Sequence, residues 1–351
     1  MRYVIGAIAL VFLLSCEERF IFDTEENSET RIVINGFINQ STGPYFVYIS
    51  QTQNSGAPRP IVGATVILMD QENNTSSFKE IDRGIYRNDN KEIVGQPGWS
   101  YSIDVTLLSG ERYQSEPDTI PLLSVEYDMT WNEYLKPFTS DLGGDFNLPV
   151  VGINLDVNIS SNNDPIFLNW LGEELYQFVP TDFPDPFGSI PPPCYVTQQI
   201  GTEQVNLFSN IGFGGDQLRV KDIFWREIDD TFLRKHIFSI YQYSISERYY
   251  NYLKGVESLV ENAGSLFDTP PGQVVGNFKT IEGMTKKPLG FFSAYISDTV
   301  RVAVYPSELE TFIYEECLYR GGFNRDYDRL CVDCLLLPRS TFHKPDFWIK
   351  Y

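Results

Sequence analysis

The sequence predicts a mainly β protein, in which an N-terminal Ig-like or transthyretin-like β-sandwich precedes a larger β-rich domain with one principal helix. Short runs of Val, Ile, Thr, Tyr and Phe alternate with polar residues, which is typical of half-buried strands. Turn residues separate these runs every 8–12 residues or so, roughly the spacing expected of a sandwich. One segment near residues 246–262 has helical periodicity instead.

The β-sandwich is predicted over residues 31–120 from a series of strand-like runs. The clearest is GWSYSIDVTLL, which places alternate residues from Tyr101 to Leu107 on one face. The other runs are RIVINGFI, YFVYISQ, GATVILMD, SFKEI, GIYRN and RYQSEPDTI. Residues 120–123 form the predicted joint to the next domain.

The second domain is predicted over residues 121–351 and starts its strand series with VVGINLDVNIS. The apolar residues of this run share one face: Val151, Ile153, Leu155, Val157 and Ile159. Further strands are expected in PIFLNWLGEELYQFV, VTQQI, VNLFSN, LRVKDIFWREI and HIFSIYQYSI. Two more strands are expected near GFFSAYI and DTVRVAVY.

The predicted helix lies in SISERYYNYLKGVESLVENAGSLF. Ser244 and Glu247 have the S-x-x-E spacing of a capping box, in which each side chain bonds a free backbone N–H at the helix start. An apolar stripe with helical spacing follows, made of Tyr249, Leu253, Val256 and Val260. We expect these aromatic and apolar side chains to belong to the core.

The chain opens with MRYVIGAIALVFLLSC, a short apolar run after one basic residue. A membrane-spanning helix needs about 20 apolar residues, so residues 1–15 read as a signal peptide and resemble that of a bacterial lipoprotein. The resemblance implies acylation of Cys16 and an anchor of several acyl chains, palmitate included. The alternative is an ordinary cleaved signal with an incidental cysteine.

Two glutamates follow the cysteine directly. Glu17 and Glu18 resemble the export signal that sends Bacteroidota lipoproteins to the outer face of the outer membrane. The alternative is that they merely begin an acidic, solvated tether, predicted over residues 16–30. The expected location is therefore the outer membrane, lipid-anchored and facing the cell exterior.

Charge and composition exclude several classes of function. The formal net charge is −20 and no basic stripe is present, so no nucleic-acid partner is expected. The chain has only two histidines, His236 and His343, which argues against a multi-histidine metal site or a Ser-His-Asp triad. We find no nucleophile elbow or phosphate-binding loop, and we predict a non-enzymatic protein without a cofactor or a metal.

Four cysteines remain after Cys16, namely Cys194, Cys317, Cys331 and Cys334. An even number in an exported chain indicates disulfides, and the sequence leaves three pairings open. We expect two bonds, with Cys194 joined to the C-terminal segment and Cys317 to the remaining thiol of CVDC, because a ring within CVDC would be strained. The alternative is a zinc site that uses all four thiolates.

Two short motifs, DTI and DTV, resemble the Asp-Ser/Thr-apolar O-glycosylation motif of Bacteroidota. Their acceptor residues would be Thr119 and Thr299. The alternative is that such short motifs occur by chance.

Several longer runs together resemble one family of Bacteroidota outer-membrane lipoproteins, labelled domain of unknown function 4249. They are RIVINGFINQSTGPYFVYIS, PIVGATVIL, IYQYSISERYYNYLKGV, GSLFDTPPGQVVGNF, LGFFSAYISDTVRV and CVDCLLLPRSTFHKPDFW. The stretch LLLPRSTFH departs from the glycine-rich polar stretch that the resemblance leads us to expect. No catalytic residue comes with the resemblance.

The resemblance implies an accessory role beside a TonB-dependent receptor, a β-barrel of the outer membrane, as a cap or as a subunit that captures cargo. The alternative is a surface protein that binds a glycan or a peptide on its own. Candidate contacts lie in the proline-rich loop and at the C-terminus, where aromatic side chains give large contact areas: Phe183, Phe187, Phe347 and Trp348. Phe347 and Trp348 could equally be core residues that close the last strand.

Overall fold

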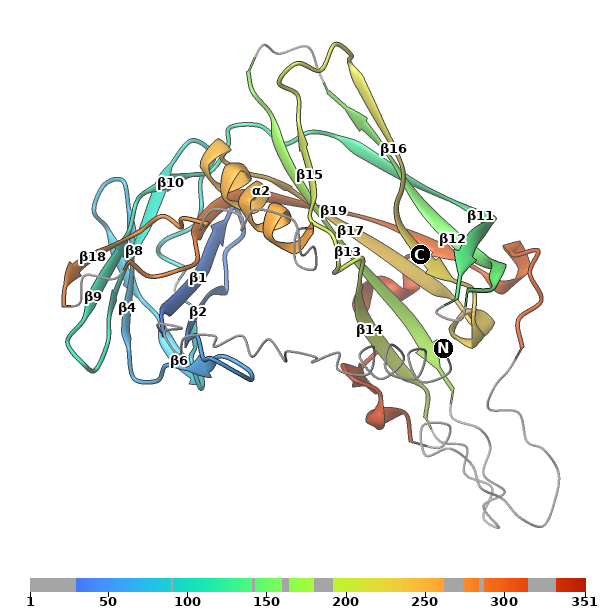
Figure 1. Cartoon of the computed structure of the whole chain (residues 1–351), viewed down its shortest axis with the longest axis horizontal. Helices are drawn as coiled ribbons and strands as arrows, with labels where there is room; N and C mark the ends of the chain where they lie inside the picture. Colours follow the sequence, from blue (N-terminus) through green and yellow to red (C-terminus); the bar gives the residue numbers. More distant parts are fainter. Residues whose placement is uncertain are drawn as a thin grey trace, which may run out of the picture.

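Strands dominate the structure, a computed structural model, and the predicted mainly β class with one principal helix is confirmed (Figure 1). The structure describes residues 30–89, 91–140, 143–159, 164–179, 192–261, 274–283, 287–314 and 333–351. Across these ranges, no helix has both the length and the apolar character needed to cross a bilayer. The helical elements are α2 (Glu247–Glu261) and the 3-10 turns η1 (Asp230–Leu233), η2 (Pro306–Glu308), η3 (Cys334–Leu336) and η4 (Asp346–Ile349).

The largest sheet has 11 strands and runs through the whole molecule, in the order β20-β14-β13-β17-β19-β1-β2-β7-β6, with β15 beside β13 and β3 beside β2. Its strands are β1 (Ile32–Asn39), β2 (Tyr45–Gln51), β3 (Arg59–Pro60), β6 (Lys79–Asp82), β7 (Ile85–Asn88), β13 (Phe167–Phe178), β14 (Cys194–Ile200), β15 (Asn206–Ser209), β17 (His236–Ser244), β19 (Phe292–Val304) and β20 (Ser340–Thr341). Two smaller sheets pack against its two halves, which gives the molecule two lobes (Figure 1).

The N lobe is the β-sandwich that forms at the β1–β2 half of the large sheet. Its second layer is a six-stranded sheet of β4 (Thr65–Asp70), β5 (Thr75–Ser77), β8 (Ser100–Thr106), β9 (Arg112–Ser115), β10 (Asp118–Thr119) and β18 (Phe278–Glu282). The predicted inward face of β8 is confirmed, because Tyr101, Ile103, Val105 and Leu107 are all buried in this core.

Two strands from far along the chain complete the N lobe. β18 pairs with β9, and the first half of β19 pairs in parallel with β1, Gly36 opposite Phe292. Phe278, Phe292 and Ala294 from these strands belong to the N-lobe core. The sandwich therefore includes strands from before and after residue 120. The predicted domain boundary at this residue stays a prediction.

β19 corrects the expectation of two separate strands near GFFSAYI and DTVRVAVY. It runs without a break from Phe292 to Val304, and its second half pairs antiparallel with β17, Ile296 opposite Ser244 and Val304 opposite His236. Asp298 and Thr299, which resemble turn residues in the sequence, continue the strand because β17 supplies a full ladder of backbone partners. β19 therefore belongs to both lobes.

The C lobe is a second sandwich, formed at the other half of the large sheet. Its outer layer is a three-stranded sheet of β11 (Tyr127–Thr139), β12 (Asp145–Asn158) and β16 (Gln217–Glu227). The predicted apolar face of residues 151–159 is confirmed, since all five of its side chains are buried in the C-lobe core. β11 was not predicted, and it pairs with β12 along its whole length, from Tyr127 opposite Val157 to Thr139 opposite Asp145.

Helix α2 lies between the two lobes (Figure 1). The predicted cap at Ser244 is wrong, because Ser244 is a buried residue of β17. Ser246 caps the helix instead: its Oγ accepts a hydrogen bond of 3.1 Å from the backbone N–H of Tyr249. Ser246 also donates to the carboxylate of Asp118 in β10 at 2.6 Å, so the cap ties the helix to the N lobe.

Candidate functional site

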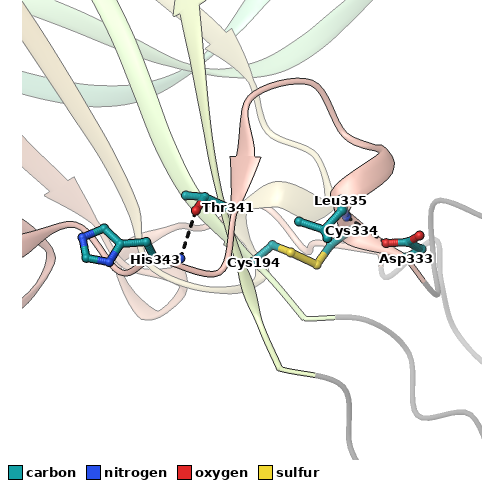
Figure 2. The surroundings of a disulfide bond; sticks show 6 residues. All are labelled: Cys194, Asp333, Cys334, Leu335, Thr341 and His343. Atoms are coloured by element: carbon teal, nitrogen blue, oxygen red, sulfur yellow. Dashed lines mark hydrogen bonds between the residues drawn. A yellow bond between two sulfur atoms is a disulfide. The ribbon is translucent and has the colours of Figure 1, made fainter.

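One predicted disulfide is present, between Cys194 in β14 and Cys334 in η3 (Figure 2). Both cysteines are buried and their Cα atoms are 6.0 Å apart, which is the usual separation for a disulfide. The bond removes two of the four thiolates that the zinc alternative requires. Cys317 and Cys331 lie outside the described residues, so the second bond stays a prediction.

The C-terminal segment beyond this bond packs on β14. Tyr195 pairs with Thr341 of β20, and its ring meets Trp348 edge-on at 5.1 Å. Trp348 is buried, and the Lys235 ammonium lies 4.5 Å from its ring centre. Phe347 is half-buried beneath the Arg301 guanidinium. The partner-contact role of Phe347 and Trp348 stays a prediction, and Trp348 leaves little surface for a partner.

The remaining predicted contact and targeting residues, Phe183, Phe187, Cys16, Glu17 and Glu18, lie outside the described residues.

The two glycosylation candidates have different surroundings. Thr119 is exposed in β10, where its hydroxyl lies 2.7 Å from that of Ser100. Thr299 is half-buried in β19 and lines a cleft of about 840 Å³. A sugar on Thr299 would therefore start inside a cleft, whereas one on Thr119 would start on an open surface. Both modifications stay predictions.

This cleft lies between β19, the starts of β11 and β16, and the end of β12. Its carboxylates include Glu126, Asp128, Asp156 and Asp298, and Arg219 is the one basic residue in its wall. In the part of the chain that the structure describes, no group of three or more His, Cys, Asp or Glu side chains is arranged to hold a metal ion. The cleft thus offers a negative surface without a metal-binding arrangement.

A buried ionic cluster fixes the outer sheet of the C lobe to the large sheet. The Arg226 guanidinium of β16 reaches Glu174 of β13 at 3.1 Å, and His236 Nε2 of β17 lies 3.1 Å from the same carboxylate. Glu174 and His236 are both buried. Burial alone would lower the pKa of Arg226, but the carboxylates of Glu174 and Asp229 raise it above its usual value, so the arginine stays charged.

The imidazole of His236 stacks on Phe232 with ring centres 4.0 Å apart. Its Nδ1 has no hydrogen-bond partner among the described residues. Because both His236 and Glu174 are buried, this cluster is placed to hold β16 on β13 and β17 rather than to meet a substrate.

The C lobe has an exposed aromatic pair at the hairpin where β11 ends and β12 begins. This hairpin lies away from the N lobe (Figure 1). Phe138 and Phe146 pair directly across the two strands, and their ring centres are 5.4 Å apart. We call this surface the distal patch; it consists of Phe138 and Phe146, both exposed on the outer face of the β11–β12 pair.

The segment that carries Phe312 is held against β11 by Glu133. The carboxylate of Glu133 accepts hydrogen bonds from the backbone N–H groups of Glu310 and Thr311, at 2.7 and 2.9 Å. Phe312 follows directly and is 87% exposed. This segment is anchored on the Glu133 face of β11, opposite the face that carries Phe138 and Phe146. The two side chains of the distal patch are presented by paired strands, so burying them against a partner would cost little conformational entropy.

The sequence did not indicate the distal patch, because β11 itself was missed. The available signal is the alternation at the start of that strand, where Tyr127, Met129 and Trp131 point to the core and the residues between them point out. Extending this alternation along the chain would have placed Phe138 on the solvent face.

Two fused β-sandwiches that share one sheet, with one helix at the junction, define a mainly β protein whose exposed Phe and Trp side chains, among the described residues, all lie beyond residue 121. A family model described as "Domain of unknown function (DUF4249)" matches residues 17–301. The chain belongs to this family. Neither the curated proteins nor the solved structures contain a match to the chain.

Proposed function

We propose that the chain is a surface-exposed outer-membrane lipoprotein and a non-enzymatic accessory partner of a TonB-dependent outer-membrane receptor. The observation that carries the partnership is the distal patch, in which Phe138 and Phe146 form an exposed aromatic pair across two strands. Aromatic residues are enriched in the cores of interfaces, so an exposed and pre-arranged aromatic pair favours a contact surface.

The lipid anchor and the tether would set the reach of the molecule. Fifteen extended residues, the length of the predicted tether over residues 16–30, span at most about 50 Å. The patch would then dock on the outer rim of the receptor, while the N lobe acts as a spacer or dock. The role is to cap the receptor or to help capture its cargo.

The partnership is tested by a pull-down of the native lipoprotein in mild detergent. We expect a TonB-dependent receptor in stoichiometric amount with the wild type, and its loss with the double variant Phe138→Asp, Phe146→Asp. Tyr48→Asp is the matched control, because Tyr48 lies on the N lobe and is 44% exposed, as are Phe138 and Phe146. Recovery of the lipoprotein alone from wild-type cells contradicts the partnership.

The location is tested separately on intact cells. Added protease should remove the wild-type protein, and Cys16→Ala should give an unlipidated protein that does not remain on the surface. If the wild type survives in intact cells and is cut only after lysis, the outward orientation is wrong.

A further inference from the structure

The outer face of the β11–β12–β16 sheet carries a groove of about 440 Å³. It is separate from the distal patch, and its wall is almost entirely polar. Leu155 and Val220 contribute backbone to it, while their side chains pack in the C-lobe core. The polar side chains of the wall include Thr130, Asn132, Asn154, Asp156, Arg219 and Lys221.

A β-bulge in β16 shapes the groove. The pairing with β12 shifts register between Ile153 and Leu155, and Asp222 in the bulge has a φ of 49°, in the left-handed region that few non-glycine residues adopt. The backbone N–H of Asp222 donates to the Asn154 side chain at 3.0 Å, which holds the bulge in place. Bulges re-aim side chains, and they are frequent beside functional sites.

Gly152 provides the space for the next contact. A Cβ at this position would lie 2.1 Å from the Asp222 carboxylate and 2.8 Å from the Tyr134 ring, so only glycine lets these two groups meet over β12. Burial and the nearby Asp222 carboxylate raise the pKa of the Tyr134 phenol, so its hydroxyl keeps its proton. The Tyr134 ring thereby forms one wall of the groove.

Asn132 and Asn154, on neighbouring strands, line the groove and bond each other. The Asn154 amide donates to the Asn132 side-chain oxygen at 2.8 Å, which leaves the Asn132 NH₂ group without a partner among the described residues. The Thr130 hydroxyl also has no partner within that part of the chain. Asp156 and Arg219 form an ion pair of 3.1 Å, and together with Asp222 and Lys221 the wall holds two acidic and two basic residues.

We propose that this groove binds a neutral oligosaccharide. The two acidic and two basic residues of its wall balance in charge, so the groove favours neither an anionic nor a cationic ligand. Its lack of aliphatic side chains disfavours a peptide with apolar anchor residues. Planar amide, carboxylate and guanidinium groups can each bond two neighbouring hydroxyls, and Tyr134 offers an aromatic surface to a sugar ring. The assignment goes beyond the receptor partnership and does not depend on it.

The test is a calorimetric titration of the full chain, purified in mild detergent. The probes are maltohexaose, cellohexaose, laminarihexaose, xylohexaose and mannohexaose. We expect at least one of these probes to bind with a Kd below about 1 mM. Asn132→Asp should weaken that binding about tenfold or more, because it keeps the acceptor for Asn154 but removes the donor that faces the groove.

Asn35→Asp is the matched control and should leave the affinity unchanged. Asn35 is also an exposed strand residue whose side-chain oxygen accepts a hydrogen bond, from the backbone of Phe291, but it lies on β1 outside the groove. The proposal is overturned if none of the five probes binds, if Asn132→Asp binds as well as the wild type while remaining folded, or if hexagalacturonate, an anionic probe, binds more tightly than all of them.

Discussion

The two lobes bury similar apolar cores but present different surfaces. Within the described residues, the exposed Phe and Trp side chains all lie beyond residue 121: Phe138, Phe146, Phe213, Trp225, Phe312 and Phe342. The N lobe exposes Tyr48, whose ring stacks on the half-buried Phe46, and aliphatic residues such as Leu108 and Leu122. The difference teaches that the N lobe is built as a scaffold, whereas the C lobe carries both surfaces that we propose to bind other molecules.

The same contrast holds for arginine–carboxylate pairs. In the N lobe, the Arg112 guanidinium donates to the Asp104 carboxylate through two nitrogens, and water reaches the guanidinium. In the C lobe, the Glu174 carboxylate is buried and shared with His236, and the Arg226 side chain is less exposed than that of Arg112. Replacing one partner should therefore matter far more in the C lobe.

The largest effect is expected from breaking the covalent link that only the C lobe has. Cys194→Ser opens a loop whose ends are 140 residues apart, which corresponds to about 5 kcal/mol of unfolding free energy in the chain-entropy model. Urea unfolding followed by tryptophan fluorescence measures the change. Cys317→Ser combined with Cys331→Ser should retain this bond, and a destabilisation by this double variant equal to that by Cys194→Ser would contradict the prediction.

The next effect concerns the buried cluster. Glu174→Ala should lower the unfolding free energy by about 3–5 kcal/mol, because Arg226 and His236 lose their buried acceptor. Glu173→Ala is the neighbouring control and removes one bond from the Tyr241 hydroxyl, worth about 1 kcal/mol. Asp104→Ala in the N lobe should lower the unfolding free energy less than Glu174→Ala does. The reverse order would contradict the proposed difference between the two arginine–carboxylate pairs.

A smaller effect is expected at the junction, where α2 meets the N lobe. Ser246→Ala removes the cap of α2 and the bond to Asp118, and should cost about 1–2 kcal/mol. Ser244→Ala should be neutral or slightly stabilising, since its buried hydroxyl has no partner among the described residues. Thermal unfolding of both variants, followed by circular dichroism, measures the difference. A larger loss of stability for Ser244→Ala than for Ser246→Ala would contradict the assignment of Ser246 as the cap.

The smallest effect is a pH dependence at the same junction. Burial raises the pKa of Asp118 above 3.8, against the hydrogen bonds from Ser246 and from the Ala294 backbone. The native state then binds the proton more readily than the unfolded state, so this carboxyl lowers the unfolding free energy as pH rises through the window between 3.8 and the raised pKa. Unfolding free energies of the wild type minus those of Asp118→Asn should fall across that window; a flat or rising difference is the contrary result.

Much of the fold follows from local patterns, because strands such as β1 and β2 bury alternate residues, and β8 and β12 alternate apolar with polar or small residues over much of their length. β11 escaped prediction because apolar Leu135, Pro137 and Phe138 follow one another closely near its end and obscure the alternation. The single strand β19 was hidden by Asp298 and Thr299, whose turn-like character is overridden by pairing with β17.

The candidate sites were harder to predict than the strands. Asn132, Asn154 and Asp222 come from three different strands, and only the pairing of β11, β12 and β16 brings them into one groove. The same is true of Glu174, Arg226 and His236. The disulfide was foreseeable as a class, since four cysteines in an exported chain suggest bonds, but the choice of Cys334 over Cys331 rests on the fold.

The continuity of β19 limits how the chain can be divided. Asn35 and Phe291 are neighbours in space although they are 256 residues apart, and the N lobe is open along β1 and β9 without residues 278–296. A fragment cut at residue 120 would expose two unpaired strand edges, which are templates for aggregation. The lobes therefore cannot be exchanged between relatives as cassettes: a workable chimera must carry β18 and β19 together with the first ninety or so residues of the sandwich, and its splice points belong inside the C lobe's loops.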